Sequence, residues 1–266
     1  MPAVATASPK GAEGNQDRAL TVMVGAGGAG VVVCDGVGSY ADSGAVAEVA
    51  AGEAGRHLQA MGIDFGTRGC AGRVSTALGE RFDGATTLIV VAADESGDVA
   101  FCFVGNGSLL EVQMLDGDAG PDALRFIDLV LPHVSCAGGR PALRSFLPAA
   151  DGAAVETSLG SYRVGPGTAR LYLACSDGIA SDEERAVGRA PSGSVWKEIP
   201  RPLSALLEDL GPRWADLLVS ATAEEDLGGV LQATLLRLLA AGELDDDATV
   251  GALFLRPACD QPGTVI

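Results

Sequence analysis

Strand-like segments in this chain follow one another directly, without the alternating helices that a parallel sheet needs. Apolar, β-branched runs at 21–24 and 31–34 flank a glycine-rich turn, and those at 87–92 and 99–104 flank a short polar connection. Short turns of this kind can join only antiparallel neighbours. Helical spacing of apolar residues appears elsewhere, at 42–61, 67–82 and 203–241. This order predicts an α+β fold built on antiparallel sheets.

The first glycine-rich turn matches a nucleotide-binding pattern that its context excludes. Residues 25–30 read GAGGAG, which fits the GxGxxG fingerprint. A dinucleotide site needs a helix to begin within that pattern, so that its N-terminus can hold the pyrophosphate. Here the β-branched run at 31–34 follows instead. The glycines therefore predict a turn between two strands.

Composition limits the partners of the chain. It has 266 residues, a net charge of −17 and only two lysines, Lys10 and Lys197. Binding to nucleic acid or to an anionic membrane needs a basic patch, so neither partner is expected. No apolar stretch approaches the roughly 18 residues of a membrane span, and no signal peptide is evident, which predicts a cytoplasmic location. No two of the six cysteines have CxxC spacing, which argues against zinc.

Aspartates lie beside several of the apolar runs. Asp17 precedes the first, Asp35 and Asp177 each follow a strand-like run, and a triplet of aspartates at 245–247 precedes the last. Two carboxylates about 4 Å apart repel by roughly 4 kcal/mol at an effective dielectric constant of about 20. If these side chains converge, a divalent cation is their natural partner, and an all-oxygen site selects Mg²⁺, Mn²⁺ or Ca²⁺ over zinc.

The motifs that contain these aspartates occur in the order seen in one family. The chain resembles the metal-dependent Ser/Thr protein phosphatases of the PPM, or type 2C, family, in its bacterial form. The resemblance covers about residues 10–255 and rests on Asn15-Gln16-Asp17, Val33-Cys34-Asp35-Gly36-Val37-Gly38, Gly84-Ala85-Thr86-Thr87, Val104-Gly105-Asn106-Gly107-Ser108, Ala174-Cys175-Ser176-Asp177-Gly178-Ile179 and Asp246-Asp247-Ala248-Thr249-Val250. It implies a single domain over 1–266, with two antiparallel sheets packed as a sandwich and flanked by helices in four α-β-β-α layers.

The resemblance also implies a role for each matching residue. Asp35 would bridge two Mn²⁺ or Mg²⁺ ions, with Asp17 and the backbone carbonyl of Gly36 on one ion and Asp177 and Asp246 on the other. A water held between the ions would attack the phosphorus atom. Physics alone leaves the register of the aspartate triplet open, and the match to Thr249-Val250 selects Asp246.

Three positions depart from the family pattern, and one of them, Val37, leaves no general-acid histidine at that position. Ala12 stands where bacterial members carry the arginine that grips the substrate phosphate, and Asn106 stands where an aspartate helps to bind a third ion. Lys10 is a nearby cation that could substitute for the arginine, whereas Arg18 would point away from Asp17 in an extended segment. The third metal site is expected to be weak or absent.

Three functions are compatible with this pattern. The leading hypothesis is hydrolysis of phosphoserine and phosphothreonine in proteins, with a phosphorylated protein substrate linked to a Ser/Thr kinase. The alternatives are a catalytically weak or inactive module that binds a protein partner, which Ala12 and Asn106 motivate, and a hydrolase of small phosphorylated molecules.

Overall fold

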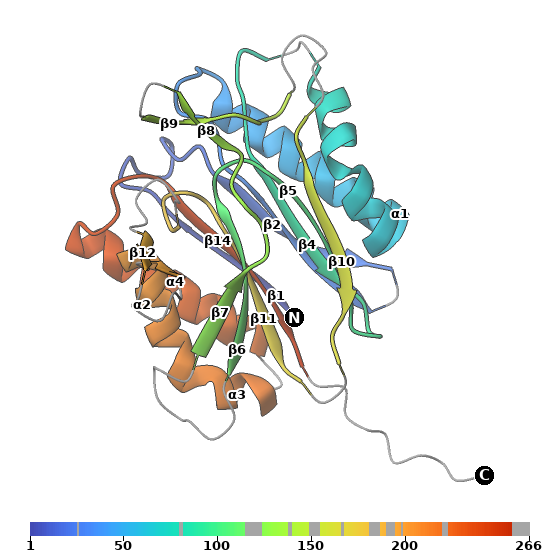
Figure 1. Ribbon diagram of the computed structural model, residues 1–266, viewed down its shortest axis with the longest axis vertical. Coiled ribbons are helices and arrows are strands. Elements are labelled where there is room, and N and C mark those ends of the chain that lie inside the picture. Colours follow the sequence, from blue (N-terminus) through green and yellow to red (C-terminus); the bar gives the residue numbers. More distant parts are fainter. Residues whose placement is uncertain are drawn as a thin grey trace.

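Two five-stranded antiparallel sheets form the centre of the molecule (Figure 1). The computed structural model describes residues 1–25, 27–79, 82–114, 124–137, 140–148, 155–165, 168–180, 187–189, 195–197, 199–219 and 223–256. The first sheet has the strand order β1 (Pro2–Ala7), β14 (Ala248–Leu255), β11 (Arg170–Cys175), β6 (Ser108–Met114) and β7 (Leu124–Asp128). The second has the order β10 (Ser158–Arg163), β5 (Asp98–Val104), β4 (Leu88–Ala93), β3 (Gly28–Cys34) and β2 (Arg18–Val24).

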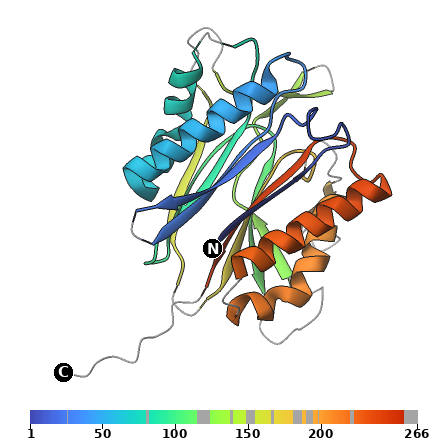
Figure 2. The ribbon, with the colours of Figure 1, turned by 180° about the vertical axis from the view of Figure 1, so that it is seen from behind.

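Helices cover the outer face of each sheet. α1 (Ser43–Leu78) packs on the second sheet, while α2 (Arg201–Leu210), α3 (Trp214–Val219) and α4 (Ala223–Ala241) lie on the first (Figures 1 and 2). A short 3₁₀ turn, Gly211–Arg213, joins α2 to α3. Two small hairpins complete the elements: β8 (Val134–Ala137) with β9 (Arg140–Leu143), and β12 (Val187–Arg189) with β13 (Val195–Lys197). The predicted α+β sandwich flanked by helices is confirmed.

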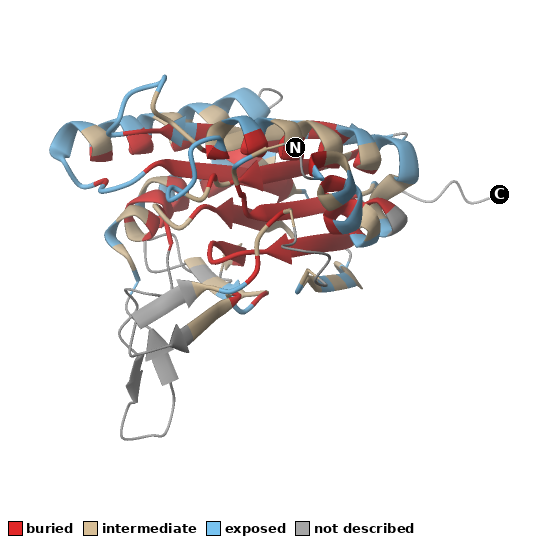
Figure 3. Ribbon diagram, turned by 90° about the horizontal axis from the view of Figure 1, so that it is seen from above, coloured by how far each residue is buried: buried red, intermediate tan, exposed pale blue. Residues whose placement is uncertain are grey.

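Three apolar layers hold these elements together, and the alternation of side chains along each strand creates them. Along β3, Val32 and Cys34 face α1, whereas Val31 and Val33 face the other sheet. Both faces of the central strands are therefore buried, which explains why these strands read as continuous apolar runs. In Figure 3 most of the described strands are coloured as buried, and the exposed residues lie on the helices and in the loops.

The glycine-rich turn joins two strands, as predicted. β2 and β3 pair in antiparallel register from Arg18 opposite Cys34 to Val24 opposite Gly28. Gly25 and Gly27 adopt positive φ angles of 58° and 86°, a conformation that favours glycine. No helix begins in this segment, so the dinucleotide reading is excluded.

Several predicted boundaries were wrong. The predicted helices at 42–61 and 67–82 are both present, but they meet at a break at Gly62, where φ is 76°, and the second ends at Leu78; together they are labelled α1. A hairpin expected from the runs at 155–159 and 161–164 is instead the single strand β10. The strand β1 was not predicted. The glycine- and proline-rich segment 116–153 contains β7, β8 and β9 where it lies within the described residues. No helix in the described ranges is long and apolar enough to span a membrane.

Candidate metal and phosphate site

The candidate site lies at one end of the sandwich, where strands from both sheets deliver their aspartates. Asp35 directly follows β3, and its backbone is fixed by the neighbouring Thr86-Thr87 segment. The Asp35 N–H donates to Thr87 Oγ1 at 3.1 Å, and the Asp35 carbonyl accepts bonds from the Thr87 N–H at 2.8 Å and the Thr86 hydroxyl at 2.9 Å. The Gly-Ala-Thr-Thr motif therefore positions Asp35 by hydrogen bonding.

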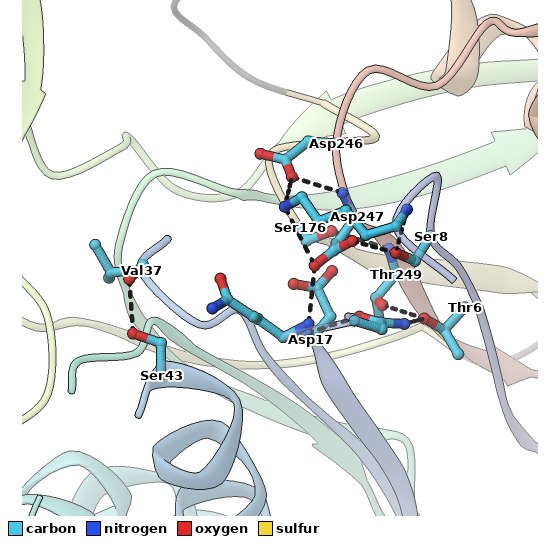
Figure 4. Close-up of polar contacts among 12 residues, drawn as sticks. Thr6, Ser8, Asp17, Val37, Ser43, Ser176, Asp246, Asp247 and Thr249 are labelled. Atoms are coloured by element: carbon cyan, nitrogen blue, oxygen red, sulfur yellow. Dashed lines mark hydrogen bonds and ion pairs between the residues drawn. The ribbon is translucent and has the colours of Figure 1, made fainter. Parts of the chain in front are cut away.

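The next residue, Gly36, sits where three backbone segments meet. A Cβ atom here would lie 2.9 Å from the carbonyl oxygens of Gln16 and Ser43. Both contacts are to backbone, which cannot yield as a flexible side chain would. The Ser43 hydroxyl also closes this turn, donating to the Val37 carbonyl at 2.6 Å (Figure 4). Glycine is therefore required at 36 because of the close approach of the Asn15–Asp17 turn and the start of α1.

Asp177 follows β11 in the other sheet and is held by β14. The Ser176 N–H donates to the Thr249 carbonyl, and the Thr249 N–H donates to the Ser176 hydroxyl, both at 2.9 Å. Gly178 lets the loop pass so close to Asp247 that an added Cβ would lie 2.1 Å from the Asp247 carbonyl oxygen. The Ser-Asp-Gly and Asp-x-Thr-Val motifs thus form one interlocked unit.

Asp17 is the most deeply buried of the predicted ligands. Its side chain is 2% exposed, and neither carboxylate oxygen has a hydrogen-bond partner within the described part of the chain. Its backbone is fixed, because the Asp17 N–H donates to Asn15 Oδ1 at 2.8 Å. A buried carboxylate without a partner is costly, and a bound cation is the kind of group that would stabilise it.

Burial and mutual repulsion raise the pKa values of Asp17 and Asp35. Burial raises the pKa of Asp17 to about 6. The pKa of Asp35 is raised well above its usual range by burial and by the negative charges of Asp17 and Asp177. Asp35 is therefore the middle member of the three, interacting with Asp17 on one side and Asp177 on the other. This is the place that a bridging ligand would occupy.

Asp246 and Asp247 have different environments, which bears on the register of the triplet. Asp247 is 4% exposed and accepts bonds from the Ser8 hydroxyl at 2.5 Å and the Gln16 N–H at 2.8 Å. Asp246 is exposed and accepts a 2.8 Å bond from Lys10 Nζ (Figure 4). The Asp246 side chain is accessible at the rim of the site, whereas the oxygens of Asp247 accept hydrogen bonds from the N-terminal loop.

The departures from the family pattern have clear structural consequences. Ala12 is exposed in the loop before Asp17, so no arginine reaches the site from that position. Arg18 is turned away: its guanidinium donates to the backbone carbonyls of Asn15 and Asp17. Asn106 is buried, and its Nδ2 donates to Asp177 Oδ2 at 2.9 Å. Asn106 thus orients Asp177 through a hydrogen bond.

These residues fit a divalent cation in charge and chemistry. As the side chains stand, no group of three or more His, Cys, Asp or Glu residues in the described ranges is arranged to hold one ion. The unpartnered oxygens of buried Asp17, however, are the kind of group that a hard cation satisfies. Within the same ranges, no lysine or arginine forms an ion pair with Asp17, Asp35 or Asp177. The donor set therefore fits the implied Mn²⁺ or Mg²⁺ in its charge and its oxygen ligands.

Sequence reasoning located the aspartates but missed part of the surrounding network. Ser8 and the buried acceptor role of Asp247 were not predicted. Lys10 was considered as a phosphate-binding residue, and the structure shows it paired with Asp246. The only signal that could have singled it out is the scarcity of lysine in a chain with 35 acidic residues.

Comparison with known proteins identifies the fold. No protein-family model matches the chain, and no curated protein matches it. Solved structures do match. The PPM Ser-Thr phosphatase MsPP from Mycobacterium smegmatis, solved with cacodylate, has a TM-score of 0.63 at 18% identity, with 95% of this chain and 97% of that chain covered. The serine/threonine phosphatase Stp1 from Staphylococcus aureus has a TM-score of 0.63 at 13% identity, covering 96% and 94%.

A third match is RsbX in complex with magnesium, with a TM-score of 0.53 at 14% identity and coverage of 94% of this chain and 92% of that chain. These likenesses extend over nearly the full length on both sides. The chain therefore has the PPM phosphatase fold, which confirms the resemblance carried by the sequence motifs.

Proposed function

We propose that this protein is a metal-dependent phosphatase that hydrolyses phosphoserine and phosphothreonine in proteins. The observation that carries the proposal is the buried, unpartnered carboxylate of Asp17 beside Asp35, with Asp177 on the other side of Asp35. The PPM fold supports it, because this set lies in a chain that is similar over its length to Ser/Thr phosphatases. The catalytic domain is proposed to span 1–266.

The proposed roles follow the positions of the side chains. Asp35 would bridge two ions, Asp17 and the Gly36 carbonyl would complete one site, and Asp177 and Asp246 would complete the other. Bound Mn²⁺ or Mg²⁺ would supply Lewis-acid chemistry and an activated water. The protein itself supplies orientation: Thr86 and Thr87 fix the backbone of Asp35.

Hydrogen bonds from neighbouring residues keep the proposed ligands in place, and the proposed reaction uses an activated water in place of a side-chain nucleophile. Ser176 and Thr249 hold the Asp177 loop against β14. Asn106 donates a hydrogen bond to one oxygen of Asp177, Oδ2. Because Asn106 brings no negative charge, the proposal includes two ions and no third one.

The test is hydrolysis of para-nitrophenyl phosphate and of phosphopeptides across a Mn²⁺ titration. Turnover should require the metal, and Asp35→Ala should lower kcat/KM by roughly a thousandfold, as expected from the loss of about 4 kcal/mol of transition-state stabilisation. Asp177→Asn should cause a comparable loss. The matched control is Asp216→Asn, which removes the charge of a carboxylate on α3 that is 71% exposed. This variant should leave turnover unchanged.

Two outcomes would redirect the proposal. If Mn²⁺ binds but neither substrate class is hydrolysed, the chain is a phosphatase-like binding module. If phosphorylated metabolites are hydrolysed much faster than phosphopeptides, the protein is a metal-dependent phosphatase that acts on small molecules, and the proposed protein substrate is wrong. A Ser/Thr kinase acting on the same phosphopeptide is the expected source of the substrate.

A further inference from the structure

Lys10 is placed at the candidate site by a tightly folded loop. The Gly11 N–H donates to the Ser8 carbonyl at 3.2 Å, and the Gly14 N–H donates to the Gly11 carbonyl at 3.1 Å. The Lys10 N–H donates to the Ser8 hydroxyl at 3.1 Å. Ser8 is in turn bonded to buried Asp247. The backbone at Lys10 is therefore fixed by contacts that do not involve its ammonium group.

The ammonium group contacts the rim of the acidic cluster. Lys10 Nζ lies 2.8 Å from Asp246 Oδ1 and 3.7 Å from Asp247 Oδ2. Asp246 Oδ1 also accepts the Asp247 N–H at 2.8 Å, so this single oxygen has two donors. In the described ranges Lys10 is the one basic side chain paired with Asp246. The side chains of Lys10 and Asp246 are 49% and 59% exposed, so the pair can open without disturbing the core.

A divalent cation and the ammonium group of Lys10 compete for the Asp246 carboxylate, and each binds it more weakly when the other is present. The ammonium is bonded to Oδ1 of Asp246, and a cation on either oxygen of this carboxylate would have to share its negative charge with the ammonium, so the two positive charges repel each other. Asp17 differs, because neither of its oxygens has a partner in the described part of the chain.

We propose that Lys10 is a built-in counter-ion that competes with a divalent cation for Asp246. This inference rests on the proposed function and concerns how the two ions bind. The ion held near Asp17 and Asp35 binds first and more tightly. The ion that uses Asp246 binds more weakly, because it must displace the ammonium group of Lys10.

The test measures metal binding without substrate. Mn²⁺ affinity and stoichiometry are obtained by isothermal titration calorimetry and by electron paramagnetic resonance of free Mn²⁺. Lys10→Gln and Lys10→Met both remove the charge, and the second keeps an apolar stem. Both should tighten the weaker Mn²⁺ site by roughly three- to tenfold, the range expected for opening an exposed ion pair and removing a nearby charge. The gain should shrink at high salt.

Two controls separate this effect from a general change in net charge. Lys10→Arg keeps the charge and should bind both ions as the wild type does. Arg68→Gln removes one positive charge from an exposed pair with Asp64 on α1, and it too should leave both affinities unchanged. Circular dichroism of the metal-free variants checks that each is folded.

The inference is overturned if neither neutral variant tightens the weaker site, or if Arg68→Gln tightens it equally. It is also overturned if the wild type binds two ions with equal affinity and Lys10→Gln does not change this. Absence of Mn²⁺ binding in every variant is a different result, because it would overturn the proposed metal-dependent function itself.

Discussion

Replacing Asp17 by asparagine should stabilise the protein when metal is absent, the opposite of the usual effect of changing a buried site residue. The Asp17 carboxylate is buried and has no hydrogen-bond partner among the described residues. Without a cation, its charge destabilises the folded state. The asparagine side chain has nearly the same shape but no charge, and its amide can form a hydrogen bond with the neighbouring Asp35 carboxyl group.

The size and pH range of the effect follow from the pKa of Asp17. Burial raises that pKa from an ordinary value near 3.8 to about 6 in the folded protein. A group whose pKa is raised on folding stabilises the folded state below its unfolded pKa and loses this contribution as the pH rises through the folded pKa. The difference of about two pKa units corresponds to roughly 3 kcal/mol above pH 6. Asp17→Asn should recover most of it.

The assay is urea denaturation of both proteins in EDTA from pH 4 to pH 8, repeated with Mn²⁺. The free energies of unfolding should separate as the pH rises from about 4 to about 6. At about a hundred times its dissociation constant, Mn²⁺ should stabilise the wild type by about 2.7 kcal/mol, and the variant by less. Asp216→Asn is the control and should show neither effect. A variant less stable than the wild type at pH 7 in EDTA would refute the reasoning.

Three further predictions concern groups around the site. Burial lowers the pKa of His133, so its contribution to the free energy of unfolding should fall as the pH drops below about 6.5, and His133→Gln should lose less stability than the wild type over this range in urea denaturation. Gly178→Ala should lower the free energy of unfolding by roughly 2 kcal/mol or more, because its Cβ would meet the Asp247 carbonyl; a wild-type melting temperature would argue against this close approach. Asn106→Ala should weaken Mn²⁺ binding about tenfold in calorimetry through loss of its bond to Asp177, and unchanged binding would remove its positioning role.

Much of the fold could be predicted because the strands in the middle of each sheet are buried on both faces. β4 and β14 read as apolar runs and were located almost to the residue, whereas for β3 only 31–34 was predicted and the strand begins at Gly28. β1 was missed because Pro2–Ala7 is rich in alanine, which has weak strand propensity. It becomes a strand because its backbone pairs with the edge of β14, and such a long-range partner leaves no local signal.

The site could be predicted only where a ligand follows a recognisable strand. Asp35 and Asp177 do so, and their glycines mark close backbone approaches. The different environments of Asp246 and Asp247 depend on the N-terminal loop, which lies more than 200 residues away in sequence. The pairing of Lys10 with Asp246 has the same origin, so neither contact could be deduced from spacing.

Anomalous diffraction from crystals of the protein soaked in Mn²⁺ tests the central claim most directly. The account predicts two Mn²⁺ ions about 4 Å apart, with Asp35 between them, Asp17 near one ion and Asp177 and Asp246 near the other. With both ions bound, Lys10 should have moved off Asp246. Manganese found elsewhere in the molecule, or a single ion that does not contact Asp35, would contradict the account.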